Sequence, residues 1–227
     1  MPELSDNKPR IVIVKNGCYR VYGNIPLREE IIISSELGIA QSWKQGKEYQ
    51  LEPGRYSLCR CGKSKNPPFC DGTHKQIDFD GTETASKENP FKETNTITGP
   101  DLLLDDEKHL CAAARFCMKA GGIWDLVENS NNPEKKALAI QEAHECPAGR
   151  LVVKQKETGK PIEPELEPSI SIVEDEFHNR PGPIWVKGGV AIVSADGTIY
   201  AKRNRVTLCR CGKSQNKPFC DGSHIQS

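Results

Sequence analysis

One cysteine-rich stretch occurs twice in the chain, and this repeat constrains the fold more than any other feature. The first copy, residues 58–74, reads LCRCGKSKNPPFCDGTH, and the second, residues 208–224, reads LCRCGKSQNKPFCDGSH. Fourteen of the 17 positions are identical at a constant offset of 150 residues, and the differences avoid every Cys and His. Copies this similar indicate two versions of one structural unit. Each motif holds three Cys and one His, which favours a metal centre.

The composition points to small modules that a metal stabilises. Apolar residues make up 36% of the 227 residues and aromatic residues 6%, which disfavours a single large core. Lys and Arg together number 31, as do Asp and Glu, so no overall charge points to nucleic acid or to an anionic membrane.

The ten cysteines indicate metal or redox chemistry in a reducing compartment. The N-terminus shows no charged-then-apolar signal pattern, and no run approaches the roughly 18 apolar residues of a membrane span. We therefore expect a cytoplasmic protein with reduced thiols and no disulfide framework.

Short β-type runs precede both motifs. The first ten residues are expected to form a loose arm, and strands are predicted over 11–14 and 19–22, around the turn Asn16-Gly17, and over 31–33 and 49–56. Before the second motif, strands are predicted over 169–173, 183–186, 190–193 and 198–201, with a turn at Asp196-Gly197. Cys18 belongs to neither motif, and we interpret it either as a small buried residue or as a distant metal ligand.

Between the motifs the pattern becomes helical. One helix is predicted from about Asp105 to Ala120, ended by Gly121-Gly122, and a second from Asn132-Pro133 to about Glu145, before a strand over 151–153. We therefore predict an α+β protein, divided into a first module (1–78), a linker (79–104), an inserted domain (105–153), a second linker (154–168) and a second module (169–227).

The spacing of the donors suits a cluster with two irons. The donors form the pairs Cys59 with Cys61 and Cys70 with His74, repeated as Cys209 with Cys211 and Cys220 with His224. One residue between the first two Cys is short for a structural zinc site, whereas two pairs suit a 2Fe–2S rhomb with one pair on each iron. Zinc remains the alternative.

The motif C-x-C-x2-S-x3-P-x-C-D-G-S/T-H resembles that of the CDGSH iron–sulfur, or mitoNEET-type, family. Both copies match it at every position, from Cys59 to His74 and from Cys209 to His224. The resemblance implies a 2Fe–2S cluster in each copy, with the C-x-C pair on the inner iron and the third Cys and the His on the outer, more exposed iron. Because single-copy members form homodimers, it also implies that the two modules pack as an intramolecular pseudo-dimer.

Other motif positions have predicted roles around the cluster. Asp71 and Asp221 can cap a helix beside the anionic cluster, and Gly62 and Gly212 can let backbone N–H groups approach its sulfides. Arg60, Lys63 and their repeats Arg210 and Lys213 either offset the cluster charge or lie on the solvated surface.

A second group of cysteines lies in the insert. Cys111, Cys117 and Cys146-Pro147 resemble the cluster run of bacterial ferredoxins, with Ala114 where the middle Cys would stand. Three thiolates with one corner missing predict a 3Fe–4S cluster, or a 4Fe–4S cluster with an outside ligand such as His109 or His144. Three buried Cys in a helical insert is the alternative.

These features predict an iron–sulfur protein that transfers single electrons. A cluster carrier or a redox- or pH-responsive sensor is the first alternative, and a zinc-stabilised scaffold the second. With no nucleophile–base pair or nucleotide loop in view, we expect no enzyme. The expected partner is a redox protein or an apo-protein that accepts a cluster. We expect the protein to be a monomer and to bind neither nucleic acid nor membrane.

Overall fold

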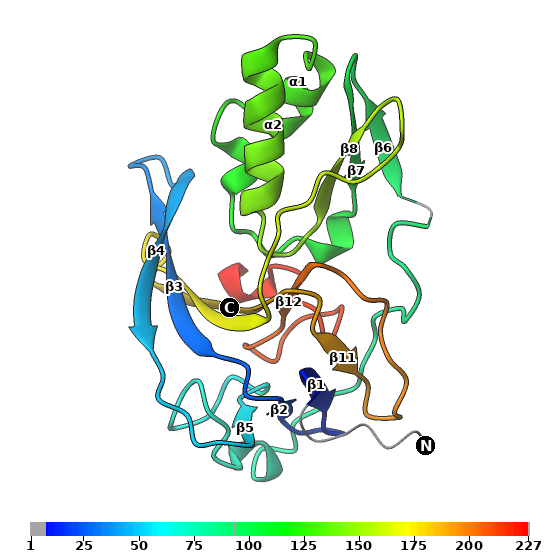
Figure 1. Cartoon of the computed structure of the whole chain (residues 1–227). Coiled ribbons are helices and arrows are strands. Elements are labelled where there is room, and N and C mark those ends of the chain that lie inside the picture. The colour runs from blue at the N-terminus through cyan, green and yellow to red at the C-terminus, as the bar shows by residue number, and fades with distance from the viewer. Residues whose placement is uncertain (1–7, 93, 227) are drawn as a thin grey trace.

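Two β-sheets form the body of the protein, and a small helical domain lies above them (Figure 1). A computed structural model describes residues 8–92 and 94–226. The strands are β1 (Arg10–Ile13), β2 (Tyr19–Tyr22), β3 (Leu27–Ser34), β4 (Ala40–Glu48), β5 (Arg55–Leu58), β6 (Asn95–Thr98), β7 (Leu102–Asp106), β8 (Leu151–Gln155), β9 (Ser169–Asp175), β10 (Arg180–Lys187), β11 (Ala191–Val193) and β12 (Arg205–Leu208). The α-helices are α1 (Ile123–Glu128) and α2 (Pro133–Glu145). In this part of the chain, every helix is too short or too polar to cross a bilayer.

The two sheets repeat one another, with a strand exchanged between the modules. One sheet has the order β11-β1-β2-β5 and the other β12-β10-β9-β3-β4. In each, three antiparallel strands of one module (β1-β2-β5 or β9-β10-β12) receive a parallel strand from the other module, β11 beside β1 and β3 beside β9. This reciprocal exchange confirms the intramolecular pseudo-dimer.

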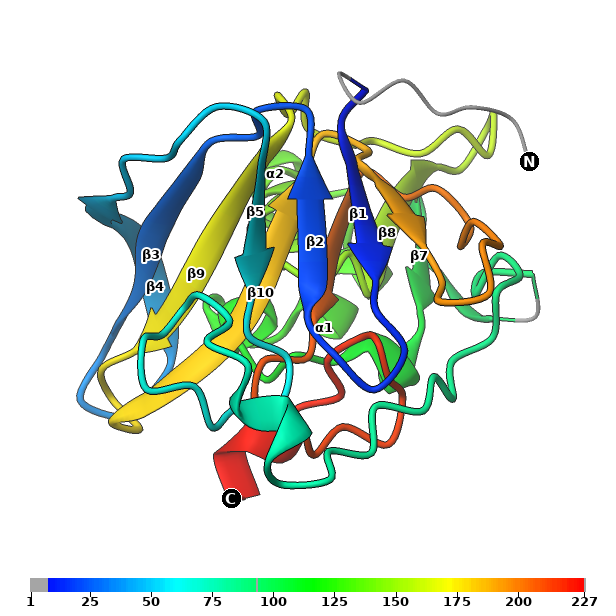
Figure 2. The ribbon, with the colours of Figure 1, turned by 90° about the horizontal axis from the view of Figure 1, so that it is seen from below.

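A single core joins the two modules. Buried side chains of β1 and β2, such as Ile11 and Val21, belong to the same cluster as Ile170 and Ile184 of β9 and β10. The two modules therefore share one core instead of having one each, because each three-stranded meander buries one face only when the other module covers it. The motif stretches, one following β5 and one following β12, lie side by side at one end of the sheets (Figure 2).

The local predictions succeed where turn and capping residues are strong. The hairpin at Asn16-Gly17 joins β1 to β2, and Gly17 N donates to Val14 O at 2.9 Å. Asn132 caps α2 by accepting hydrogen bonds from the N–H groups of Glu134 and Lys135, and α2 ends at Glu145 as predicted. Residues 198–201 form only an isolated bridge, between Val193 and Ile199. A loose arm is predicted over residues 1–10. Residues 1–7 of it lie outside the part of the chain that the structure describes.

The helix predicted from Asp105 to Ala120 is wrong. Asp105 lies in β7, single 3₁₀ turns follow at 108–110 and 116–118, and α1 begins only after Gly122. The sheet β6-β7-β8 with α1 and α2 encloses its own core, which includes Leu104, Leu126 and Val153. This domain begins within residues 79–104 and ends within residues 154–168, so both predicted linkers contribute strands.

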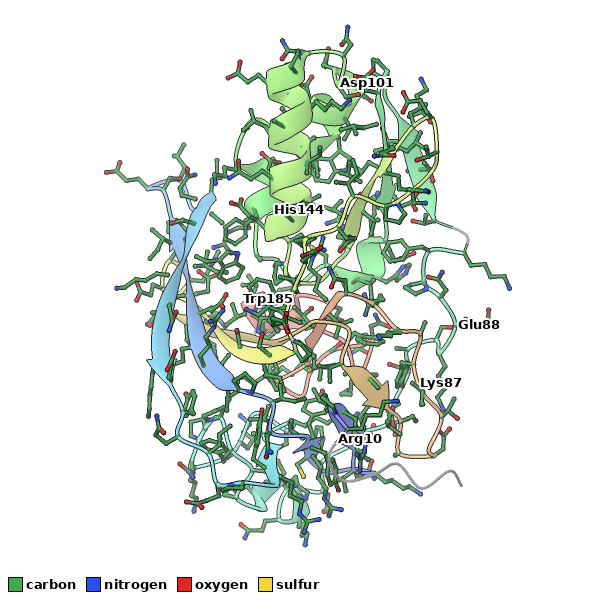
Figure 3. The ribbon with its side chains drawn as sticks, viewed as in Figure 1. Arg10, Lys87, Glu88, Asp101, His144 and Trp185 are labelled. Atoms are coloured by element: carbon green, nitrogen blue, oxygen red, sulfur yellow. The ribbon has the colours of Figure 1, made fainter. Side chains whose placement is uncertain are left out.

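The β3–β4 hairpin holds this middle domain against the modules. Strand β4, which no sequence pattern predicted, carries Trp43, whose ring stacks on Phe116 at 4.7 Å and contacts Trp185 at 4.9 Å. Trp185 lies beneath the helical layer (Figure 3). The guanidinium of Arg115 adds a two-pronged hydrogen bond to Asp175 on β9, at 2.7 and 3.1 Å. The second module has no counterpart of β4 among its described strands.

Candidate metal centres

Both motif loops begin where a strand ends, and both fold in the same way. Cys59 N donates to Pro68 O at 2.8 Å, and the repeat pair Cys209 and Pro218 has the same distance. The hydroxyl of Ser64 donates to Phe69 O at 2.6 Å, as Ser214 does to Phe219 O at 2.7 Å. These bonds turn the loop back on itself, so Cys59 and Pro68, nine positions apart in sequence, come together.

The motif aspartates close the loops. Asp71 accepts hydrogen bonds from Lys65 N at 2.7 Å and from Thr73 N at 3.0 Å, and Asp221 accepts the equivalent pair. Thr73 begins a single 3₁₀ turn, Thr73–Lys75, whose N-cap is Gly72 and not Asp71, so the predicted role of Asp71 as a helix cap is wrong. Hydrogen bonds from Lys65 and Thr73 hold the pKa of Asp71 well below its usual range, which keeps this carboxylate ionised and able to accept them.

The predicted ligands converge in pairs. We call Cys59, Cys61, Cys70 and His74 the first centre, and Cys209, Cys211, Cys220 and His224 the second. The Sγ atoms of Cys59 and Cys61 lie 3.7 Å apart and those of Cys209 and Cys211 3.8 Å apart. His74 Nδ1 lies 3.4 Å from Cys70 Sγ, and His224 Nδ1 is equally far from Cys220 Sγ.

These distances fit a tetrahedral metal at each pair. Two thiolates bound to one tetrahedral metal at roughly 2.3 Å lie about 3.8 Å apart, and a thiolate and an imidazole nitrogen about 3.6 Å apart. Within residues 8–92 and 94–226, no three such side chains gather closely enough to share one ion. The residues therefore fit a group with two metals, each held by one pair.

Burial distinguishes the two centres. His224 and Cys220 are 6% and 3% exposed, whereas His74 and Cys70 are only half-buried. Burial lowers the pKa of His224, which favours the neutral imidazole that a metal needs, and burial raises the pKa of the Cys220 thiol. A bound cation would reverse the preference of that thiol, because it stabilises the thiolate.

The motif glycines lie where the two loops touch. An ideal Cβ on Gly62 would lie 2.6 Å from Cys211 O, and one on Gly212 would lie 2.8 Å from Cys61 O. Both residues have positive φ, 71° and 80°. From the sequence, these glycines are predicted to let backbone N–H groups approach the cluster sulfides. In the structure, each glycine also lets its module approach the cysteine backbone of the other module.

The motif arginines differ between the copies. Arg60 is 1% exposed; its Nη2 donates to Gly81 O at 2.6 Å, while Nε and Nη1 have no hydrogen-bond partner among the described residues. Arg210 instead donates to Glu174 at 2.8 Å. A solvated surface position is thus wrong for Arg60, and its buried charge beside two ligands fits an anionic cluster.

Two residues outside the repeat lie beside the centres: Cys18, predicted to be either a small buried residue or a distant ligand, and Tyr19, for which no role was predicted. Cys18, buried at 8% exposure, reaches the Cys70 thiol and helps to raise its pKa after the larger effect of burial. The hydroxyl of Tyr19 hydrogen-bonds Cys209 O at 2.9 Å and Pro218 O at 3.1 Å, which links the first module to the second centre. Neither residue lies in the repeat, so no sequence signal placed them there.

The three cysteines of the insert line one small cavity. Cys111, Cys117 and Cys146, here called the middle centre, surround it together with Ala114 and Arg150. Burial, and then the nearby Cys146, raises the pKa of Cys117 to about 12. Arg150 binds Asp106 through two hydrogen bonds of 2.6 and 2.9 Å and lies beside Cys111, so a positive charge faces the thiols. Convergent thiols beside a fixed cation fit an anionic cluster.

Neither histidine suggested as a fourth ligand lines this cavity. His109 is exposed and contacts Glu107 at 2.9 Å. His144, near the end of α2 in Figure 3, has its Nε2 3.0 Å from Ile162 O. The prediction that His109 or His144 supplies a fourth ligand to the middle centre is therefore wrong.

A buried carboxyl in α2 makes the middle domain sensitive to pH. Glu142 is 1% exposed and accepts a hydrogen bond from Ala120 N at 2.6 Å, and burial raises its pKa to about 7. The raised pKa means that its stabilising effect is complete below the unfolded value of 4.5 and is lost as the pH rises through about 7. We expect Glu142→Gln to increase the free energy of unfolding by about 3 kcal/mol at pH 8 and by much less near pH 5, as measured by denaturant titration.

The exposed Glu134 on the same helix provides the control for this prediction. Glu134→Gln should change the free energy of unfolding equally at both pH values. An equal gain for Glu142→Gln at pH 5 and pH 8 would show that Glu142 is not protonated in the folded protein.

The comparisons with known families agree with this geometry. A family described as an iron-binding zinc finger of CDGSH type matches residues 16–75 and 181–225. A family described as a divergent 4Fe-4S mono-cluster matches residues 97–156, between the two. No curated protein matches the chain.

The fold, the converging thiols and these matches define an iron–sulfur protein. The chain carries two domains of the CDGSH type, residues 16–75 and 181–225, with a divergent mono-cluster domain, residues 97–156, between them.

Proposed function

We propose that the protein carries single electrons through three iron–sulfur clusters. The first and second centres would each hold a 2Fe–2S cluster with three Cys and one His, and the middle centre a 3Fe–4S cluster. Such clusters accept and release one electron at a time. The residues supply the ligands, and the buried Arg60 and the paired Arg150 supply positive charge beside two of the centres.

One observation carries the proposal: the loop of the second centre touches the loop of the first centre and the loop of the middle centre. The backbone after Cys61 meets that of Cys211, and Gly222 of the second motif meets Cys111. Ligand loops packed edge to edge bring the clusters close, as passage of an electron between them requires. We accordingly propose that the protein is an electron carrier rather than an enzyme. We also propose that it is a monomer and that it binds a redox protein in the cytoplasm.

The choice of 3Fe–4S for the middle centre follows from its ligand count. The matched family is described by a 4Fe-4S cluster, which needs four ligands. Here Ala114 lines the cavity where a further thiol would stand, and three thiols remain.

Electron paramagnetic resonance with an iron count tests this function. We expect seven irons per chain, a signal from the oxidised middle centre and two signals from the reduced 2Fe–2S centres, all appearing and disappearing reversibly. A colourless protein that contains zinc would overturn the proposal in favour of a scaffold.

Cluster delivery is a second function, favoured by the half-buried Cys70 and His74 of the first centre. Mixing the holo-protein with an apo-ferredoxin distinguishes the two functions. Transfer of iron and sulfide within minutes would favour delivery, while none over hours, with fast reversible reduction, would favour electron transfer.

The histidines should raise the reduction potential of their clusters. Cysteine at His74 or His224 would replace a neutral ligand by an anionic one, which disfavours the more negative reduced state. We expect each His→Cys variant to lower the potential of its own centre by on the order of 100 mV, measured by redox titration, and to leave the other centre nearly unchanged. An unchanged potential would show that the replaced histidine is not a ligand.

A further inference from the structure

The two CDGSH motifs are nearly identical in sequence, but the middle domain contacts only one of them closely. An ideal Cβ on Gly222 would lie 3.2 Å from Cys111 O and 3.6 Å from Ala113 Cβ. At the repeat position, Gly72, such an atom would meet nothing within 4 Å. In Figure 1 the second motif (red) lies directly beneath the helical domain, and the first motif lies farther from it.

More contacts fix this docking beside the ligands. Cys220 packs in one buried cluster with Ala112 and Ala148, and Cys146 lies against it. Asn216, two residues before Pro218, donates from Nδ2 to His109 O at 3.0 Å. The third cysteine of the second motif therefore contacts the loops that carry the thiols of the middle centre.

The other side of the second centre faces the first. The contacts of Gly62 with Cys211 O and of Gly212 with Cys61 O join the two C-x-C segments. Tyr19 adds a hydrogen bond from the first module to Cys209 O. The second centre thus meets the middle centre near Cys220 and the first centre near Cys211.

The first centre is the more open of the two at its Cys–His pair, while a cavity between the two motifs reaches Cys59 of the first centre and Cys211 and His224 of the second. A surface cavity lies beside His74, lined by Val14, Lys15, Asn16, Lys75, Asp78, Phe79 and Asp80. No residue of the middle domain lines it. His74 and Cys70 are half-buried, whereas His224 and Cys220 are buried.

We infer that the second centre relays electrons between the other two centres, and that the first centre is the one that faces a one-electron carrier protein. This division of work rests on the proposed electron-transfer function. An electron passes between the middle and first centres by way of the second. Each step oxidises one cluster and reduces its neighbour by one electron, and no atom is transferred. The outer pair of the second centre faces the middle centre and its inner pair faces the first.

Spin coupling in the full-length holo-protein tests this order. His74→Cys and His224→Cys each shift one 2Fe–2S signal in the dithionite-reduced protein and so assign the two signals. We expect the signal assigned to the second centre to relax faster because of the middle centre, and to lose this enhancement in Cys117→Ser. Equal enhancement of both signals, or enhancement of the first alone, would overturn the inference.

Gly222 and Gly72 provide a matched pair that leaves every ligand in place. Their φ values are 86° and 89°, so alanine meets the same backbone strain at both positions, but only Gly222→Ala presses on Cys111. We expect Gly222→Ala to weaken the coupling between the second and middle centres and Gly72→Ala to preserve it. Equal coupling in the two variants would overturn the inference.

Removal of iron gives a readout that does not depend on electron flow. With an iron chelator in excess, we expect the first centre to be lost before the second. Loss of both at the same rate would contradict the greater exposure of the Cys70–His74 pair. Failure of electron transfer itself would be recognised differently, by clusters that are present and coupled but are not reversibly reduced.

Discussion

Gly62→Ala should destabilise the whole protein and release iron from both CDGSH centres. Alanine at a φ of 71° costs about 1–3 kcal/mol from backbone strain alone. The new methyl group would also lie 2.6 Å from Cys211 O, and because a backbone atom cannot rotate away, one of the two loops must move. For a chain of this size we expect the melting temperature to fall by about 10 °C or more.

Gly54→Ala separates the two contributions to this effect. Gly54 also has a positive φ, 106°, but a Cβ there would meet nothing within 4 Å. It lies before the first motif, so its alanine variant should show the strain without the contact between modules. If both variants lowered the melting temperature equally and retained their iron, the approach of Gly62 to Cys211 would have no role in stability.

The parts of the fold predicted from sequence are those that local chemistry determines. Asn132-Pro133 sets the start of α2, and Asn16-Gly17 sets the β1–β2 turn, because a cap and a tight turn depend on few neighbouring atoms. Strand β4, AQSWKQGKE, has no alternation of apolar residues, because one edge of it lies at the border of a sheet and most of its side chains are exposed. Only its pairing with β3 makes it a strand.

The helix wrongly predicted from Asp105 shows the limit of capping signals. Asp is a residue that favours the start of a helix, but in the structure the carboxylate of Asp105 accepts a hydrogen bond from Thr96 Oγ1 across the β6–β7 pair at 2.7 Å. The residues after it are held by the contacts of Arg115 and Phe116 rather than by a helical pattern. Tertiary contacts override propensity in such a segment.

The candidate ligands can be named from the sequence because the repeat marks each of them, whereas their different surroundings cannot. Cys70 and Cys220 occupy the same position of one motif, yet Cys220 is covered by Ala112 and Ala148 of an inserted domain. Nothing in the 17 residues of either motif encodes that cover. It follows from where the insert docks, which depends on side chains outside the repeat.

Arg205 is one of these side chains, and Arg205→Ala should detach the middle domain from the second module. Arg205 is 1% exposed, and its guanidinium donates to Cys146 O and Ala143 O, both at 2.8 Å, at the C-terminal end of α2. It also forms an ion pair with Glu163. Removing it would leave Glu163 without its ionic partner and each of the two carbonyls with a single backbone N–H donor, at a cost of about 2–3 kcal/mol.

Loss of this anchor should affect the middle centre first, because the carbonyl that Arg205 holds belongs to the ligand Cys146. We expect the signal of the middle centre to weaken while the two 2Fe–2S signals persist, as measured by electron paramagnetic resonance and an iron count. The repeat supplies the matched control: Arg55 occupies the same position of the first module and is exposed. Arg55→Ala should change the free energy of unfolding by at most about 0.5 kcal/mol and leave all three signals intact. If both variants kept the middle centre, the docking of the insert would depend on the β3–β4 hairpin and its Trp43–Phe116 stack instead.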